Sequence, residues 1–200
     1  MISLGVQKLL VRGYVLIKLS LLFWLYAFSG FLILGIGPAL ITVAELYKQH
    51  QWHYQKIKVS EGWRIFKQNF KFGNLYFYLF GSVIAILCYN LFLSVQTRGL
   101  VFIVTDFIII FTLLILISMF HFGILLIASY EVDLRETLKL AFIQFFNNFL
   151  EVIKLLGGFI GIAIMTYKFP GLILFGTIPA ALVWTAFVSK NWYAKLEKAI

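Results

Sequence analysis

Few side chains in this 200-residue sequence are placed to do chemistry. His50 and His53 stand three residues apart, and Glu45 precedes them by about one helical turn, so on a helix they could share a metal ion. Histidines and a tryptophan beside a lysine are also typical anchors at a membrane surface, and we favour that role here. We therefore expect no metal site and no cofactor.

Asp106 and His121 lie inside a long apolar block. Ionisable groups in such a place are candidates for a proton or substrate relay. Fifteen residues separate them, about 22 Å along a helix, so they cannot form one relay directly. We favour an ion pair with Arg98 or solvation for Asp106, and packing or a helix–helix hydrogen bond for His121.

Motifs that would indicate an enzyme are absent from the sequence. It contains no phosphate-binding G-x-x-x-x-G-K-[ST], no zinc-binding H-E-x-x-H and no nucleophile elbow G-x-S-x-G. No pair of carboxylates falls within an apolar block. We therefore expect a protein that is not an enzyme, and an intramembrane enzyme is the least favoured class.

The amino-acid composition indicates the solvent in which the helices that position these residues must fold. Apolar residues make up 62% of the chain and charged residues only 12%, so a soluble domain could not bury enough of its surface. A net charge of +9 fits cytoplasmic loops facing anionic lipid better than it fits nucleic acid. The single cysteine, Cys88, excludes an internal disulfide.

The apolar blocks predict an all-α, polytopic helical membrane protein, with residues 1–200 forming one integral membrane domain. About five transmembrane helices are expected, over residues 16–44, 73–95, 100–130, 150–167 and 170–188. Gly37 and Pro38 fall inside the first span, where they predict a kink or break and form one candidate functional feature.

Lysine and arginine counts predict the orientation. Five spans place the basic loop over residues 45–72, the segment 131–154 and the C-terminal tail on one side, with 12 cations against 5 on the other. The positive-inside tendency then puts these loops and the C-terminus in the cytoplasm of the cell, with the N-terminus outside. Alternatively, the first block enters the membrane and turns back, which leaves four full crossings and an internal N-terminus.

Two cytoplasmic segments are expected to be amphipathic helices. In Trp63–Phe72 the apolar face holds Trp63 and Phe66, and in Leu134–Val152 it holds Phe142, Phe145 and Phe149. The segments share three of five positions when 66–70 is aligned with 142–146, which suggests an internal repeat of span, amphipathic helix and span. These aromatic faces are candidate interaction surfaces.

Small residues in a later block suggest close helix packing. Gly157 and Gly161 have the G-x-x-x-G spacing that lets membrane helices approach one another. We expect packing within the bundle or against a partner from this pattern, and no chemistry.

The chain resembles the YesL-like family (domain of unknown function 624). The residues that carry the resemblance are Trp24, Gly37-Pro38-Ala39, the stretch from Trp63 to Lys71, and Thr137-Leu138-Lys139-Leu140-Ala141. The resemblance implies an all-helical multi-pass protein of Gram-positive bacteria, often encoded near ATP-driven carbohydrate uptake systems. It implies no catalytic residues.

Two functions follow as expectations. The first is a non-enzymatic accessory or assembly subunit of a carbohydrate uptake system, with the lipid bilayer and permease subunits as partners. The chain is not expected to be the permease, because residues 131–154 lack the Glu-Ala-Ala and following Gly of a permease coupling loop. The alternative is a small solute transporter or channel, motivated by Asp106, His121 and the suggested repeat.

Overall fold

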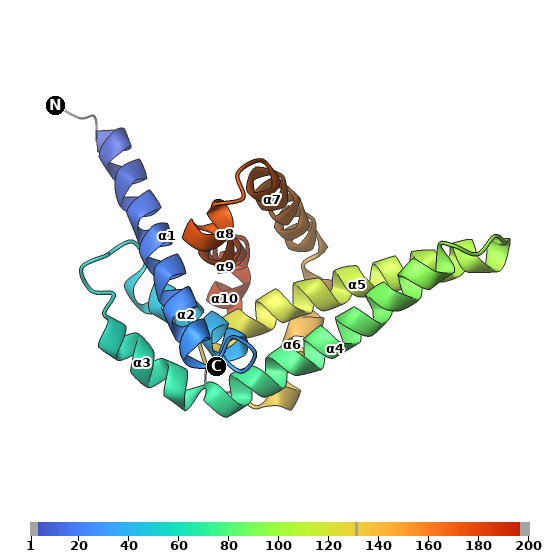
Figure 1. The fold of residues 1–200 in the computed structure, drawn as a ribbon, viewed down its shortest axis with the longest axis horizontal. Helices are drawn as coiled ribbons and strands as arrows, with labels where there is room; N and C mark the ends of the chain where they lie inside the picture. The colour runs from blue at the N-terminus through green and yellow to red at the C-terminus, as the bar shows by residue number, and fades with distance from the viewer. Residues whose placement is uncertain (1–3, 131, 197–200) are drawn as a thin grey trace.

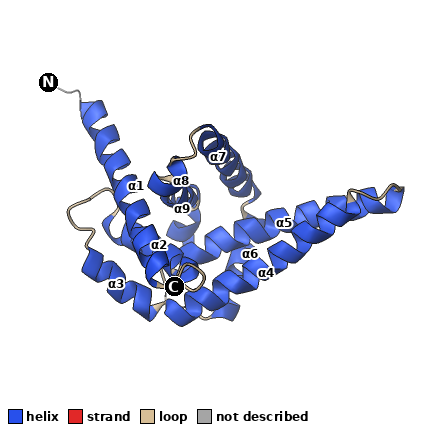
Figure 2. Cartoon of the chain, in the orientation of Figure 1, coloured by secondary structure: helices blue, strands red, loops and turns tan. Residues whose placement is uncertain are grey.

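The computed structural model describes residues 4–130 and 132–196, and the regular structure within them is entirely helical (Figures 1 and 2). The helices are α1 (Leu4–Ser29), α2 (Ile36–His50), α3 (Val59–Gln68), α4 (Phe70–Ser94), α5 (Leu100–Ile127), α6 (Leu134–Asn147), α7 (Phe149–Lys168), α8 (Leu172–Phe175), α9 (Thr177–Val188) and α10 (Lys190–Leu196). In this part of the chain, α1, α4, α5 and α7 are long and apolar enough to cross a membrane. The predicted all-α polytopic fold is confirmed, with four such helices in place of five.

The first predicted span, 16–44, is not one helix. The chain reverses between Ser29 and Ile36, and α2 packs back along α1. Phe31 and Leu32 adopt φ angles of 57° and 61°, a left-handed conformation that few non-glycine residues take. Pro38 lies in the first turn of α2, where its missing N–H removes no helical hydrogen bond. The break predicted at this proline is therefore a complete reversal just before it.

The turn at the tip of the α1–α2 hairpin satisfies its own backbone donors. Each N–H from Gly30 to Ile36 donates to a backbone carbonyl of the turn or of the end of α1. The Tyr78 hydroxyl of α4 donates to the carbonyl of Ile33 over 2.6 Å. Irregular backbone is tolerated at membrane depth only where its polar groups have partners, so this uncharged tip is suited to hydrocarbon.

Each amphipathic helix is joined to the following membrane helix by one asparagine. Asn69 separates α3 from α4, and Asn148 separates α6 from α7. Asparagine competes with the helix by bonding the nearby backbone, and the Asn69 amide donates to the carbonyl of Ile65 over 3.2 Å. The predicted amphipathic helix Leu134–Val152 therefore ends at Asn147, and Phe149 belongs to α7.

These breaks correct the register of the suggested repeat. When Asn69 is aligned with Asn148, Phe66 falls on Phe145. Over the eight positions 62–69, each residue is then buried, half-buried or exposed like its counterpart in 141–148. The alignment of 66–70 with 142–146 is wrong by three residues. The corrected register supports a duplicated unit, with α2–α3–α4 matching α5–α6–α7.

The last predicted span, 170–188, is divided at Gly176 into α8 and α9, and α9 has only 12 residues. The core lies where α1, α2, the start of α4 and the second half of α5 meet. Its largest side chains are at most 2% exposed and include Phe23, Tyr26, Tyr76 and Phe122. Beyond this core, the outer halves of α4 and α5 extend as a long hairpin away from the other helices (Figure 1).

Candidate functional site

Gly37 and Pro38 form the crossing point of α2 and α4. Both residues are buried, and a Cβ on Gly37 would collide with the carbonyl oxygen of Gly73. A Cβ on Gly73 would lie 2.8 Å from the Cα of Pro38. Glycine at both positions lets the two backbones touch, as small residues do between membrane helices. The pair therefore has a packing role in this structure.

Trp63 and Phe66 belong to an aromatic stack that fastens α3 to α1. The ring centroids of Trp63 and Phe66 are 5.5 Å apart, and that of Phe66 is 5.8 Å from Tyr26. The Tyr26 hydroxyl donates to the carbonyl of Val59 over 2.9 Å. Phe66 is buried, whereas Trp63 is 36% exposed and carries the Lys67 ammonium 5.5 Å from its ring. Only the Trp63 side of this stack is available to a partner or a membrane surface.

The three phenylalanines predicted on one face of the second amphipathic segment do not share a role. Phe145 is buried against α5, where its ring lies 6.5 Å from that of Phe111. Phe142 and Phe146 form a pair 4.7 Å apart that is exposed on α6, and Phe149 is exposed on α7. The exposed aromatic surface therefore centres on Phe142 and Phe146.

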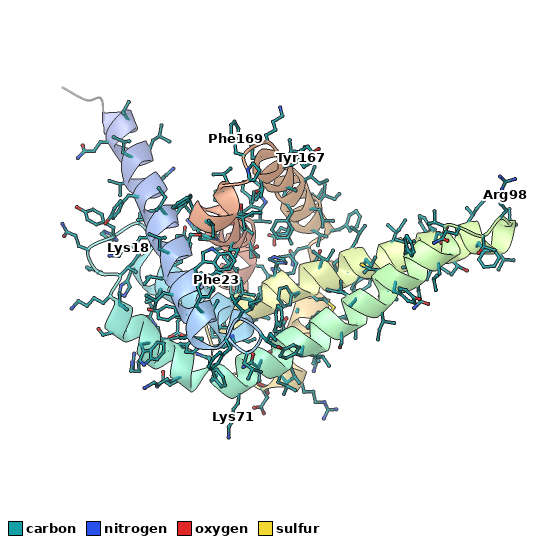
Figure 3. The ribbon with its side chains drawn as sticks, viewed as in Figure 1. Lys18, Phe23, Lys71, Arg98, Tyr167 and Phe169 are labelled. Atoms are coloured by element: carbon teal, nitrogen blue, oxygen red, sulfur yellow. The ribbon has the colours of Figure 1, made fainter. Side chains whose placement is uncertain are left out.

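Asp106 and His121 lie on the same helix, α5, and are not brought together. One carboxylate oxygen of Asp106 is enclosed but has no hydrogen-bond partner among the described residues, and no ion pair joins Asp106 to Arg98 there. Arg98 stands at the far tip of the α4–α5 hairpin (Figure 3). His121 packs on Phe159 of α7, with ring centroids 4.4 Å apart, and its Nδ1 lies 2.9 Å from the carbonyl oxygen of Ile117.

His50, the last residue of α2, and His53, which follows it, contact two different groups. His50 Nε2 lies 2.8 Å from a carboxylate oxygen of Glu61, which joins the end of α2 to the start of α3. His53 Nδ1 lies 3.1 Å from the carbonyl oxygen of His50. Among the residues described, no group of three potential ligands could hold a metal ion. Nearby, burial raises the pKa of Glu45, and this effect outweighs the Arg64 charge and the Gln49 hydrogen bond, which lower it.

The glycine pair at 157 and 161 does not make the expected close contact within this chain. A Cβ added to Gly157 or Gly161 would meet nothing within 4 Å. Gly158 is the position that requires a glycine, because the Trp184 indole of α9 lies directly against it. The indole N–H donates to the carbonyl of Lys154 over 3.1 Å, which fixes the ring in this place.

The outer α4–α5 hairpin exposes polar side chains on an otherwise apolar surface. Ser82, Tyr89 and Asn90 are exposed on α4, and their spacing places them near one face of that helix. Asn90 donates to the carbonyl of Ile86 in its own helix over 2.9 Å, and its side-chain carbonyl makes no hydrogen bond with the residues described here. Cys88 is exposed two residues away. The sequence pattern did not predict this stripe.

A cavity of about 1100 Å³ between α1, α2, α5, α7 and the α8–α10 segment was also not predicted. Three of its lining residues are Arg12, Lys48 and Lys190, which lie far apart in the sequence. The Arg12 guanidinium carbon lies 5.2 Å from the Trp52 ring centroid, and Lys48 Nζ lies 5.3 Å from that of Tyr193. Cations beside aromatic residues near helix ends were the only sequence signal for this site.

This arrangement of long apolar helices and short amphipathic ones defines a helical multi-pass membrane protein. Residues 16–91 match the model of a family described as a protein of unknown function, DUF624, which agrees with the predicted resemblance over that part of the chain. The match begins in α1, ends in α4, and includes Trp24, the Gly37–Pro38 pair of α2 and the stretch from Trp63 to Lys71. No curated protein and no solved structure matches the chain.

Proposed function

We propose that this chain is a non-enzymatic accessory or assembly subunit that docks, through the α4–α5 hairpin, onto membrane subunits of an ATP-driven carbohydrate uptake system. The carbohydrate system comes from the family resemblance, and the docking surface comes from the exposed Asn90 stripe. Asn90 is the observation that carries the proposal, because an amide that faces lipid lacks a partner for its carbonyl oxygen. A polar group on a neighbouring membrane helix would supply one, at about 0.6–2 kcal/mol.

The placement of cations supports one orientation for such a subunit. Arg12 of α1 contacts Trp52, and the Lys18 ammonium donates to the carbonyl of Tyr54 over 2.8 Å. The N-terminal cations thus lie beside the basic loop, which favours the alternative with an internal N-terminus. The opposite side then keeps only Arg98 and Lys168. We infer that the N-terminus, the basic loop and the C-terminus face the cytoplasm of the cell.

In this orientation, the α1–α2 hairpin enters the membrane and returns. The uncharged part of α1, from Leu19 to Ser29, has a length of about 16 Å, roughly half of a hydrocarbon core of about 30 Å.

Cys88 is the only cysteine in the chain, and its position two residues from Asn90 places it on the other side of α4, so a direct test moves the thiol to Ile86, which is 60% exposed and one turn from Asn90. In membranes of the native host, a short thiol-to-amine crosslinker on the chain with Ile86→Cys and Cys88→Ser should join it to a permease subunit of the uptake system. The chain with Cys88→Ser alone should give no such product. Mass spectrometry of the crosslinked band identifies the partner.

Variants at Asn90 separate a docking role from chance proximity. Asn90→Leu should reduce the crosslinked product about 3- to 30-fold, as expected from the loss of one interhelical hydrogen bond. Asn90→Gln keeps an amide at this position and should retain most of the crosslinked product. A chain that crosslinks only to a second copy of itself, or purifies alone while the permease keeps full transport, would contradict the proposal.

A second candidate function is a small solute transporter or channel, and the duplicated α2–α3–α4 and α5–α6–α7 units favour it, because many transporters are built from repeats. Purified chain in liposomes would then carry sugar or ion flux. Asp106→Asn or His121→Ala would reduce that flux if either side chain takes part. Absence of flux, together with normal growth of both variants, would exclude this function.

A further inference from the structure

The cavity between α1, α2 and the α7–α9 pair has two chemically different ends. Arg12, Lys48 and Lys190 line it together with Trp52 and Tyr193, and none of the described lining residues is acidic. A smaller hollow of about 360 Å³ shares Arg12 and Trp52 and adds Lys8. Cationic groups from three helices, α1, α2 and α10, therefore line the same cavity.

The other end of the cavity is apolar and lies deeper along α1. Ser20 and Trp24 of α1 donate to the carbonyls of Leu174 and Ile173, so α8 packs two to three turns beyond Arg12. This separation corresponds to about 12–18 Å along the helix axis. Leu172 of α8 lines the cavity, and most of the other lining residues are apolar. The cavity thus passes from a cationic mouth to an apolar interior.

We propose that this cavity binds an anionic phospholipid, with its phosphate between Arg12 and Lys190 and an acyl chain in the apolar interior. Charge complementarity selects the headgroup, since basic pockets between membrane helices hold anionic lipid headgroups. The volume of about 1100 Å³ exceeds the range of about 300–1,000 Å³ that is usual for small-molecule pockets. A soluble phosphate would leave the apolar interior empty, which favours the lipid.

Two glycines on α7 provide a matched steric test. Gly161 lines the cavity, whereas Gly157, one turn earlier, does not, and a Cβ on either would meet nothing within 4 Å. Gly161→Leu should fill the apolar interior and exclude the acyl chain. Gly157→Leu adds the same side chain to the same helix and should leave binding intact.

Charge variants test the mouth of the cavity. Arg12→Gln with Lys190→Gln should weaken binding about 30-fold, from roughly fivefold for each cation near an anionic headgroup. Lys71→Gln with Lys139→Gln removes the same charge from exposed sites on α4 and α6 that do not line the cavity, and should change little.

Binding is measured on the full chain in mild detergent, by native mass spectrometry and by the rise in Tm on adding lipid. Phosphatidylglycerol should bind one per chain and raise the Tm, whereas phosphatidylcholine with the same acyl chains and glycerol 3-phosphate should not. Equal binding of phosphatidylcholine would overturn the role of the cations, and stabilisation by glycerol 3-phosphate alone would identify a soluble anion instead. Equal lipid binding by Gly161→Leu and Gly157→Leu would show that the lipid lies outside the cavity.

Discussion

The backbone contact between α2 and α4 predicts opposite outcomes for one substitution at two places on α4. A Cβ on Gly73 would lie 2.8 Å from both the Cα and the N of Pro38. Carbon atoms in ordinary contact are about 3.5–4.0 Å apart, so Gly73→Ala must separate α2 from α4 by about 1 Å. A Cβ on Gly81, two turns further along, would meet nothing within 4 Å.

The magnitudes follow from these contacts. Either alanine gains about 1 kcal/mol of helix propensity over glycine. Overpacking costs about 1–3 kcal/mol, and the upper part of that range applies at Gly73 because backbone atoms of Pro38 cannot rotate away. Gly81→Ala should therefore stabilise the protein by about 1 kcal/mol. Gly73→Ala should lie about 2–3 kcal/mol below Gly81→Ala in its free energy of unfolding.

Unfolding of the purified chain by increasing sodium dodecyl sulfate in mild-detergent micelles, followed by tryptophan fluorescence, measures this difference. The expected order of stability is Gly81→Ala, then the natural chain, then Gly73→Ala. If Gly73→Ala proves as stable as Gly81→Ala, then α2 and α4 do not cross at a backbone contact, and the close packing inferred at Gly37 and Pro38 is refuted.

Three further predictions use the same unfolding assay. Tyr78→Phe removes the 2.6 Å hydrogen bond to Ile33 and should lower the free energy of unfolding by about 1 kcal/mol, whereas no loss would mean that the tip does not depend on it. Burial raises the pKa of Glu45 above 4.5, so its protonation stabilises the folded state; this contribution is complete below pH 4.5 and is lost as the pH rises through the folded pKa. Glu45→Gln should weaken that pH dependence and stabilise the protein at neutral pH, and an unchanged pH profile would contradict this. Gly158→Leu should displace the Trp184 ring, shift its emission and cost about 1–3 kcal/mol, and an unaltered spectrum would argue against the contact.

The membrane helices could be located from the sequence because length and hydrophobicity determine them. The ends of α4, α5 and α7 lie within three residues of the limits expected from the apolar blocks. The aromatic positions of α3 follow only in part from helical spacing, since Phe66 is buried as expected, whereas Trp63, expected on the same apolar face, is 36% exposed.

The reversal between α1 and α2 could not be predicted in full. Residues 19–44 are uncharged and long enough for one span, so hydropathy alone favours a single helix. The reversal depends on left-handed backbone at Phe31 and Leu32, residue types with no preference for it. Gly35 and Pro38 indicated a break without its direction.

The cavity was missed for a different reason. Arg12, Lys48 and Lys190 belong to three helices and come together only through the tertiary fold. No local spacing pattern connects them. The exposed polar face of α4 could likewise not be predicted, because whether Asn90 points to lipid or to a neighbouring helix depends on how the α4–α5 hairpin leaves the core.

The self-satisfied turn between α1 and α2 has a consequence for biosynthesis. All seven N–H groups from Gly30 to Ile36 find acceptors within residues already synthesised when α2 leaves the ribosome. The hairpin can therefore partition into the bilayer as a unit before α4 exists. The carbonyl of Ile33 accepts from Tyr78, which is synthesised some 45 residues later, so α4 would add this hydrogen bond to a hairpin that has already formed.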